Sequence, residues 1–423
     1  MKQFKTDLLA GWLAKATRYG IFAAAFFLPL SFDAASWFLN VAALAWFGRM
    51  GLERRWLVQT GPFDKWIWLL IGCSFISVGF SPDRDFSFYN YYHLMGRYVL
   101  FYYLTLSNFT RVEEVRRMAF VLLSSSALVC LYGFYQYLAG SIMAAEWVDR
   151  EQFPELTMRV FSTLENPNLL AGYLVSLASL TGGMLWQETE KRTRLLLAAL
   201  GLAQIGCLVL TYSRGSWLSL LAVVALAGVL INRRLLWLLA VVPVALLIGH
   251  EAVLERIMSV MNPTDTSSML RLALWESTVA MIQDHPWFGI GWGSYWMVYP
   301  EYDFFIQNPA VKILHAHNMY LNFAAEIGLP GFVAFMTVLI AHGRMAVRNW
   351  RKAGPKARGM FLGMAASFVG ILLNGLTDYV LFNIQLSLLY WLTLALIIVL
   401  QRATMAQAAS GVDRKYQGVS GRN

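Results

Sequence analysis

Long apolar windows, each close to the length of a membrane-crossing helix, repeat along this chain of 423 residues. Short polar or charged segments separate them, and the pattern predicts twelve spans. The expected spans are 17–32, 34–50, 64–80, 95–108, 117–139, 168–186, 195–212, 215–231, 235–250, 318–343, 360–378 and 382–400. The sequence therefore predicts an all-α polytopic membrane protein, because helices satisfy their backbone hydrogen bonds within one segment.

The spacing of these windows divides the chain into four parts. Residues 1–250 are expected to hold nine spans, with a shorter loop near 140–167. A large polar loop follows at 251–317. Three further spans are expected in 318–400, and 401–423 form a tail.

The large loop contains a pattern typical of an amphipathic helix. Ser267 or Ser268 is placed to cap its start, and His285-Pro286 ends it. The apolar positions at helical spacing are Leu272, Trp275, Val279 and Ile282. Gly289, Gly291 and Gly293 then predict a flexible turn. We expect the helix to lie on the membrane, with its neighbouring tryptophans at headgroup depth: Trp287, Trp292 and Trp296.

The distribution of charged residues supports twelve spans and predicts their orientation in the membrane. The composition is 58% hydrophobic and 14% charged. With the N-terminus inside, 26 of the 34 Lys and Arg residues fall on the cytoplasmic side. The positive-inside rule therefore favours twelve spans with both termini in the cytoplasm. The net charge of +9 reflects this asymmetry and gives no argument for nucleic acid.

Other sequence signals are sparse. We find no removable signal peptide. The three cysteines lie within apolar runs, as small core residues do, and their spacing indicates neither a disulfide nor a metal site.

Arg214 is the most unusual charge in an apolar context, in "LVLTYSRGSWLSLLAVV" (208–224). A central arginine in a membrane helix costs roughly 2.5–3.5 kcal/mol, so it is by default a functional candidate. The alternation of spans places it in a tight outer turn with Gly215. A snorkelling interfacial anchor is the alternative reading.

Histidine and acidic residues give weaker signals. His315 and His317 precede the tenth span; two histidines at i and i+2 cannot share one helix face, so we expect no two-histidine metal site. A single catalytic histidine remains possible. Asp83-Arg84-Asp85 has the form of a metal-binding DxD pair, but a solvated loop is the simpler interpretation.

Four blocks, in order, carry a resemblance: "RVFSTLENPNLLAGY", "TYSRGSWLSL", "RLALWESTVAMIQDHPWFGIGWGSYW" and "HAHNMYLNFAAEIGLPG". Together they resemble the O-antigen ligase and polymerase superfamily of membrane glycosyltransferases, and the O-antigen ligases most. The resemblance covers roughly residues 155–335 by motif. It implies a GT-C-like fold with a periplasmic loop, in the bacterial inner membrane, and an active site that faces the periplasm.

The resemblance also implies substrates and residue roles. The donor would be O-antigen on undecaprenyl pyrophosphate and the acceptor a sugar hydroxyl of lipid A-core, with membrane lipids as further partners and neither nucleic acid nor a cofactor. His317 would be the general base. Arg214, Arg271 and Arg159 would bind the pyrophosphate. Possible support comes from Asn318, His315, Asn166 and Asn168.

These roles are chemically consistent. Arginine guanidinium groups bind phosphate oxygens through paired hydrogen bonds and stabilise the negative charge that develops on the leaving pyrophosphate, so no metal is required. A neutral histidine can take the acceptor proton. Direct attack by the acceptor oxygen would invert the configuration at the anomeric carbon. The sibling polymerase, a protein glycosyltransferase and a lipid-glycan transporter remain as alternatives, although no inverted repeat favours the transporter.

Overall fold

The computed structural model describes residues 2–140, 158–240, 258, 266–305 and 312–420. Every regular element in these ranges is a helix, which confirms the all-α prediction. Six helices are long and apolar enough to cross a membrane. They are α5 (Val112–Ala139), α7 (Pro167–Gln187), α8 (Lys191–Val209), α14 (Met319–Trp350), α15 (Pro355–Asn374) and, over Ile384–Ala409, α16 (Ile384–Ser420).

The remaining long helices of the bundle coincide with other expected spans. They are α1 (Lys2–Phe27), α2 (Phe32–Glu53), α3 (Asp64–Val78), α4 (Arg84–Asn108) and the shorter apolar helix α9 (Arg214–Leu230). The ninth expected span, 235–250, begins within a 3-10 helix, η2 (Arg233–Ala240), and its remainder lies outside the described residues. Twelve spans therefore stay a prediction.

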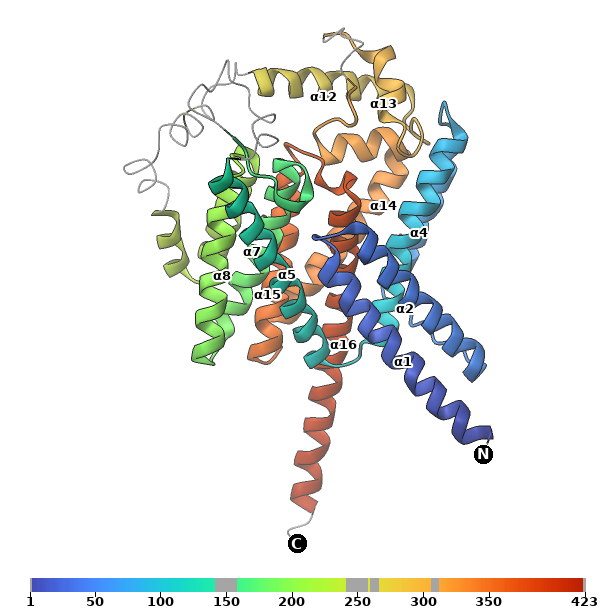
Figure 1. Cartoon of the computed structure of the whole chain (residues 1–423), viewed down its shortest axis with the longest axis vertical. Coiled ribbons are helices and arrows are strands. Elements are labelled where there is room, and N and C mark those ends of the chain that lie inside the picture. The colour runs from blue at the N-terminus through green and yellow to red at the C-terminus, as the bar shows by residue number, and fades with distance from the viewer. Residues whose placement is uncertain (1, 141–157, 241–257, 259–265, 306–311, 421–423) are drawn as a thin grey trace.

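The two chain ends lie at one end of the bundle, while α12 (Thr266–Asp284) and α13 (Tyr295–Val298) lie at the other (Figure 1). We name the latter the loop end. Helix α16 runs through the centre, with every residue from Leu394 to Leu400 buried. A helix that is apolar all round belongs in the interior of a bundle. It packs against α4, and α15 packs closely along α7.

A crossing of glycines holds α7 against α15. A Cβ atom on Gly183 would lie only 2.3 Å from the backbone nitrogen of Gly363, and one on Gly359 would lie 2.8 Å from the Gly183 oxygen. Small residues allow membrane helices to approach until their backbones touch. Helix α7 follows the "RVFSTLENPN" block, and α15 leads into the segment at 375–383. The crossing therefore fixes these two segments relative to one another.

Buried polar side chains join α5, α7 and α8. The Nε2 atom of Gln204 donates to Ser126 at 2.9 Å, and the Thr181 hydroxyl donates to the Gln204 oxygen, also at 2.9 Å. Gln204 and Thr181 are almost fully buried. Hydrogen bonds between membrane helices stabilise their association, because these groups would otherwise face hydrocarbon.

Helix α12 confirms the helix expected in the large loop, and the side chains that it packs on protein are not the apolar positions expected to lie on the membrane. The fully buried side chains are Leu274, Ser277, Thr278 and Met281, whereas Leu272 is 53% and Val279 41% exposed. The described helix begins at Thr266, so Ser267 and Ser268 lie in its first turn and do not precede it.

One of the loop tryptophans, Trp292, departs from the expectation of a common headgroup depth. Trp287 is 68% exposed, but Trp292 is 8% exposed and packs inside the protein, 6.0 Å from the ring of Tyr91. The Ser87 hydroxyl donates to the backbone oxygen of Trp292 at 2.7 Å. Trp292 therefore joins the loop to α4.

The glycine-rich turn at 289–293 is confirmed, and it is anchored. Gly289, Gly291 and Gly293 all have positive φ. Backbone N–H groups of Ile290 and Leu329 donate to Ala325 and Pro286, each at 2.8 Å. Helix α14 breaks here, at Gly328, whose φ of 70° is non-helical. The large loop is thus attached to a kink in a membrane helix.

Candidate active site

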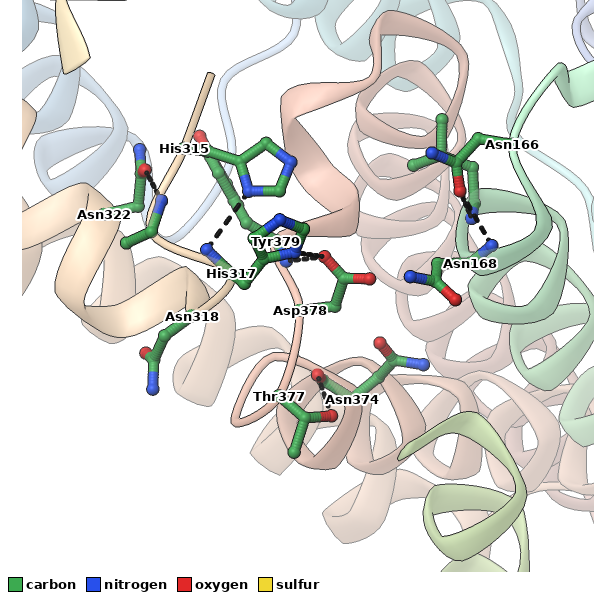
Figure 2. Close-up of polar contacts among 12 residues, drawn as sticks. Asn166, Asn168, His315, His317, Asn318, Asn322, Asn374, Thr377, Asp378 and Tyr379 are labelled. Carbon is green, nitrogen blue, oxygen red and sulfur yellow. Dashed lines mark hydrogen bonds and ion pairs between the residues drawn. The ribbon is translucent and has the colours of Figure 1, made fainter. Parts of the chain in front are cut away.

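A histidine–aspartate pair lies at the loop end, between the start of α14 and the segment after α15 (Figure 2). The Nδ1 atom of His317 is 3.3 Å from Oδ1 of Asp378, and the backbone N–H of Tyr379 donates to the same oxygen at 2.8 Å. The His317 side chain is 33% exposed and that of Asp378 11%. A histidine that donates from Nδ1 keeps a lone pair on Nε2, so this pair can act as a base with its orienting group.

Asp378 stays ionised at neutral pH. Burial raises the pKa of its carboxyl group, but the hydrogen bond with His317 and the electrostatic interactions with His317, His315 and Arg271 together outweigh burial and hold the pKa below its usual value. An ionised carboxylate stabilises the imidazolium that forms when the histidine takes a proton. Sequence analysis missed Asp378. The available signal was a carboxylate in "NGLTDYV", a short connection between two apolar windows.

His315 positions its neighbour. Its Nδ1 atom accepts the backbone N–H of His317 at 3.1 Å, and His317 has the left-handed φ of 48° that rarely suits a residue with a side chain. Burial, aided by the nearby positive charges of His317 and Arg271 and opposed by Asp378, lowers the pKa of His315 to about 3. His315 is therefore neutral, as an acceptor at Nδ1 must be.

The expectation that His315 and His317 lie on one helix, and so cannot share a metal site, is wrong. His315 and His317 precede α14 on a non-helical segment, so helical spacing does not apply. Ligand atoms of His315, His317 and Asp378 lie within 4.8 Å of one another. These are donor types that bind transition metals. The three residues are the one group of this kind among the described residues.

Arg214 lies at the first position of α9, beside the segment that carries Asp378. A Cβ atom on Gly215 would come within 2.3 Å of the Thr377 hydroxyl, so only glycine allows this approach. The Asn374 amide donates to the Ser216 hydroxyl at 2.6 Å and reinforces the contact. The "SRG" block thus packs on the 374–378 turn. The first turn of a helix also favours an anion, because its backbone N–H groups point outward.

Arg159 is fixed between the segment that precedes Arg214 and the start of α7. Its Nε donates to the backbone oxygen of Thr211 at 2.9 Å, and its Nη2 donates to the side-chain oxygen of Asn168 at 2.8 Å. The backbone N–H of Val160 donates to Leu210 at 3.0 Å. The "RVFSTLENPN" and "SRG" blocks are therefore neighbours, and the plane of one guanidinium is set by two hydrogen bonds.

Two of the expected supporting asparagines are helix caps. The Asn166 side-chain oxygen accepts the N–H groups of Asn168 and Leu169, and begins α7. The Asn318 oxygen accepts those of Tyr320 and Leu321, and begins α14. Such caps stabilise a helix by about 1 kcal/mol. Helices α9 and α14 begin at the 374–378 turn, since Gly215 approaches Thr377 and the Asn318 amide donates to the backbone oxygen of Leu376 at 3.1 Å. In the view of Figure 2, Asn166 and Asn168, at the start of α7, lie on the other side of Asp378 from Asn318.

Arg271 is the third arginine that was expected to bind the pyrophosphate. It is half-buried on α12, and its charge acts on both Asp378 and His315. Asp83, by contrast, caps α4 by accepting the N–H of Phe86 at 3.0 Å, and Asp85 lies in its first turn, so the DxD pair forms a helix start and not the expected solvated loop. The structure thus brings Arg271 and His317 to Asp378, and it packs Gly215, next to Arg214, on the neighbouring Thr377.

The fold and the site define a helical multi-pass membrane protein with a histidine–aspartate pair and arginines at one end. Residues 195–336 match a family model described as O-antigen ligase. The match spans Arg214, Arg271 and His317, and it supports a place for the chain in the O-antigen ligase and polymerase superfamily of membrane enzymes, with a role in lipopolysaccharide biosynthesis. No curated protein matches the chain.

Proposed function

We propose that the protein transfers O-antigen polysaccharide from undecaprenyl pyrophosphate to a sugar hydroxyl of lipid A-core, on the periplasmic face of the inner membrane. The observation that carries this proposal is the His317–Asp378 pair beside the helix that begins at Arg214. A base oriented by a carboxylate is suited to activating a hydroxyl. An arginine at a helix start is suited to a pyrophosphate.

The reaction divides the site into two roles. Nε2 of His317 takes the proton of the acceptor hydroxyl while that oxygen attacks the anomeric carbon. The bond between this carbon and the pyrophosphate oxygen breaks, and undecaprenyl pyrophosphate leaves with its charge stabilised by Arg214 and Arg271. Arg159 binds the same pyrophosphate from the Asn168 side. One direct displacement inverts the anomeric configuration.

Metal independence is part of the proposal. Two or three guanidinium groups supply the positive charge that a divalent cation would otherwise provide. Transfer should therefore survive an excess of chelator. Loss of transfer with chelator, restored by one divalent metal, would instead make His315, His317 and Asp378 the first candidates for metal ligands.

The decisive experiment uses purified protein, lipid-linked polysaccharide and lipid A-core. A higher-mass conjugate of the two, with inverted linkage by NMR, is the expected product, and the His317→Ala protein should form none. Longer chains on the donor lipid, without any conjugate, would favour the sibling polymerase. Movement of intact donor across a vesicle membrane without any new bond would favour a transporter.

Orientation has a separate test. In a cysteine-free background, cysteine at Thr266 should react with an impermeant thiol reagent added from the periplasmic side. Cysteine at Arg351, in the most basic connection of the chain, should be protected. The reverse labelling pattern would contradict the periplasmic site and every role assigned above.

A further inference from the structure

A cavity of about 270 Å³ lies near the histidine–aspartate pair, and Tyr379, the residue after Asp378, is in its wall. Its lining comes from α3, α4, α14, α16, the 292–296 turn and the 379–382 segment. Ten of its nineteen lining residues are aromatic, and five more are aliphatic. Exposed Phe86 and Leu314 lie at its rim, and buried Tyr390 and Trp391 line its interior. None of the residues proposed above to bind pyrophosphate lines it.

The cavity shares walls with the reactive histidines. Tyr379 and Phe382 line it, and the His315 ring packs on both, with centroids 5.9 Å and 4.5 Å away. The His315 and His317 rings are 4.3 Å apart. One layer of side chains, made of His315 with Tyr379 and Phe382, therefore lies between the cavity and the proposed base.

A few polar groups interrupt the aromatic lining. Glu326 is 9% exposed, and the backbone N–H groups of Gly293 and Tyr295 bond to its carboxyl group. Tyr390 is 2% exposed, and its hydroxyl has no hydrogen-bond partner among the described residues. A buried hydroxyl without a partner is costly, so a ligand that reaches the Tyr390 hydroxyl gives it a hydrogen bond that the protein does not supply.

The lining chemistry selects among ligands. It contains no lysine, arginine or histidine to balance a negative charge, so a phosphate is disfavoured. A hydrocarbon chain would leave Glu326 and the Tyr390 hydroxyl facing apolar atoms. A sugar ring suits both features, since its C–H face packs on the negative faces of aromatic rings and its hydroxyls bond to carboxylate and phenol. The volume exceeds the roughly 150 Å³ of a cavity that binds benzene.

We propose that this cavity is the acceptor subsite and holds an uncharged sugar ring of the acceptor, with Glu326 and Tyr390 as its polar contacts. The inference rests on the proposed function. It places the acceptor on the α4–α14–α16 side of His317 and the pyrophosphate on the α7–α9 side. An inverting displacement needs this arrangement, because the nucleophile and the leaving group occupy opposite sides of the anomeric carbon.

Tyr390→Phe is the sharpest test. It removes only the hydroxyl, and because that hydroxyl has no partner in the protein, folding stability should not fall. We expect the KM for lipid A-core to rise by about 2- to 13-fold, which corresponds to one hydrogen bond of about 0.5–1.5 kcal/mol. The KM for the donor should not change. Glu326→Gln should raise the acceptor KM as well.

Tyr102→Phe is the matched control. Tyr102 is also fully buried with a hydroxyl that lacks a partner among the described residues, but it does not line the cavity. Its acceptor KM should equal that of the wild type. Equal acceptor KM values for Tyr390→Phe, Glu326→Gln and Tyr102→Phe would overturn the proposal, as would a selective rise in the donor KM.

A binding measurement separates this proposal from the proposed function. Deacylated core oligosaccharide, without donor, should show saturation-transfer NMR signals with the wild-type protein, weakened by Tyr390→Phe and unchanged by Tyr102→Phe. Absence of these signals, in protein that forms the conjugate, would overturn the subsite and leave the transfer reaction intact. Conversely, binding without any transfer from the donor would support the subsite and contradict the proposed function.

Discussion

Replacing Asp378 with asparagine would keep the shape of the side chain and remove its charge. In the native pair, Oδ1 of Asp378 lies 3.3 Å from Nδ1 of His317 and accepts the Tyr379 N–H at 2.8 Å. Asparagine can keep the second contact through its carbonyl oxygen. It loses the charge that stabilises an imidazolium, and its amide can donate to Nδ1, which moves the proton of His317 onto Nε2 and blocks the base.

The size of the effect follows from the contact. A hydrogen bond to a charged group contributes about 1.5–3 kcal/mol, which corresponds to about a 10- to 150-fold loss of kcat. The separation of 3.3 Å is long for such a bond, so the lower part of this range applies to the lost charge alone. A change of tautomer would add to it; in a serine protease triad the same substitution lowers kcat by about 10⁴.

The assay is single-turnover transfer with saturating donor and acceptor. Asp284→Asn is the control, because Asp284 is an exposed carboxylate at the loop end that accepts the Tyr302 hydroxyl at 2.8 Å and lies outside the site. We expect normal abundance and donor binding for both variants, with slow chemistry only for Asp378→Asn. A kcat within twofold of the wild type for this variant would refute the role of Asp378.

Four further outcomes are expected. His317→Ala should abolish transfer and His315→Ala should be milder, whereas the reverse order in the same conjugate assay would make His315 the base. Arg214→Lys should bind donor about 10- to 150-fold more weakly, because lysine keeps the charge and loses the paired bonds; near-normal donor affinity in a titration would return it to a membrane anchor. Gly215→Ala should impair transfer through its collision with Thr377, and Thr377→Ala should partly restore it; a fully active Gly215→Ala protein would remove the need for this approach. Stability in detergent should fall from about pH 6.5 toward pH 4, by up to about 1.4 kcal/mol per pH unit, because His315 with its pKa of about 3 stays neutral when folded but binds a proton when unfolded; thermal melts of His315→Gln should show a weaker dependence on pH, and an unchanged dependence would exclude His315 as its source.

The sequence predicted the helices well because apolar length is a local property. The starts of α7 and α14 are also determined locally, because Asn166 and Asn318 cap these helices by accepting N–H groups two and three residues further along the chain. The side of α12 that packs on protein was not predicted. Apolar residues occur on more than one side of this helix: Leu272 and Val279, which were expected to lie on the membrane, are exposed, while Leu274 is buried against protein.

The site was only half predictable, because its parts are distant along the chain. His317, Arg214 and Arg271 followed from a resemblance in ordered blocks. Asp378 lies outside those blocks, and its partner is 61 residues away, so no local pattern joins the two. The close approach of Gly215 to Thr377 is likewise a tertiary event, which a glycine in a turn does not reveal by itself.

The crossing of Gly183 and Gly363 has a consequence for genetics. Helix α7 leads away from the Arg159 segment and α15 leads toward Asp378, so a methyl group at the crossing would separate the phosphate side from the base side. Misplacement of reacting groups by about 1 Å can cost about 10²-fold in rate. A random mutagenesis screen for cells that lack surface polysaccharide should therefore recover alanine and larger residues at these two uncharged positions, in protein that still accumulates in the membrane.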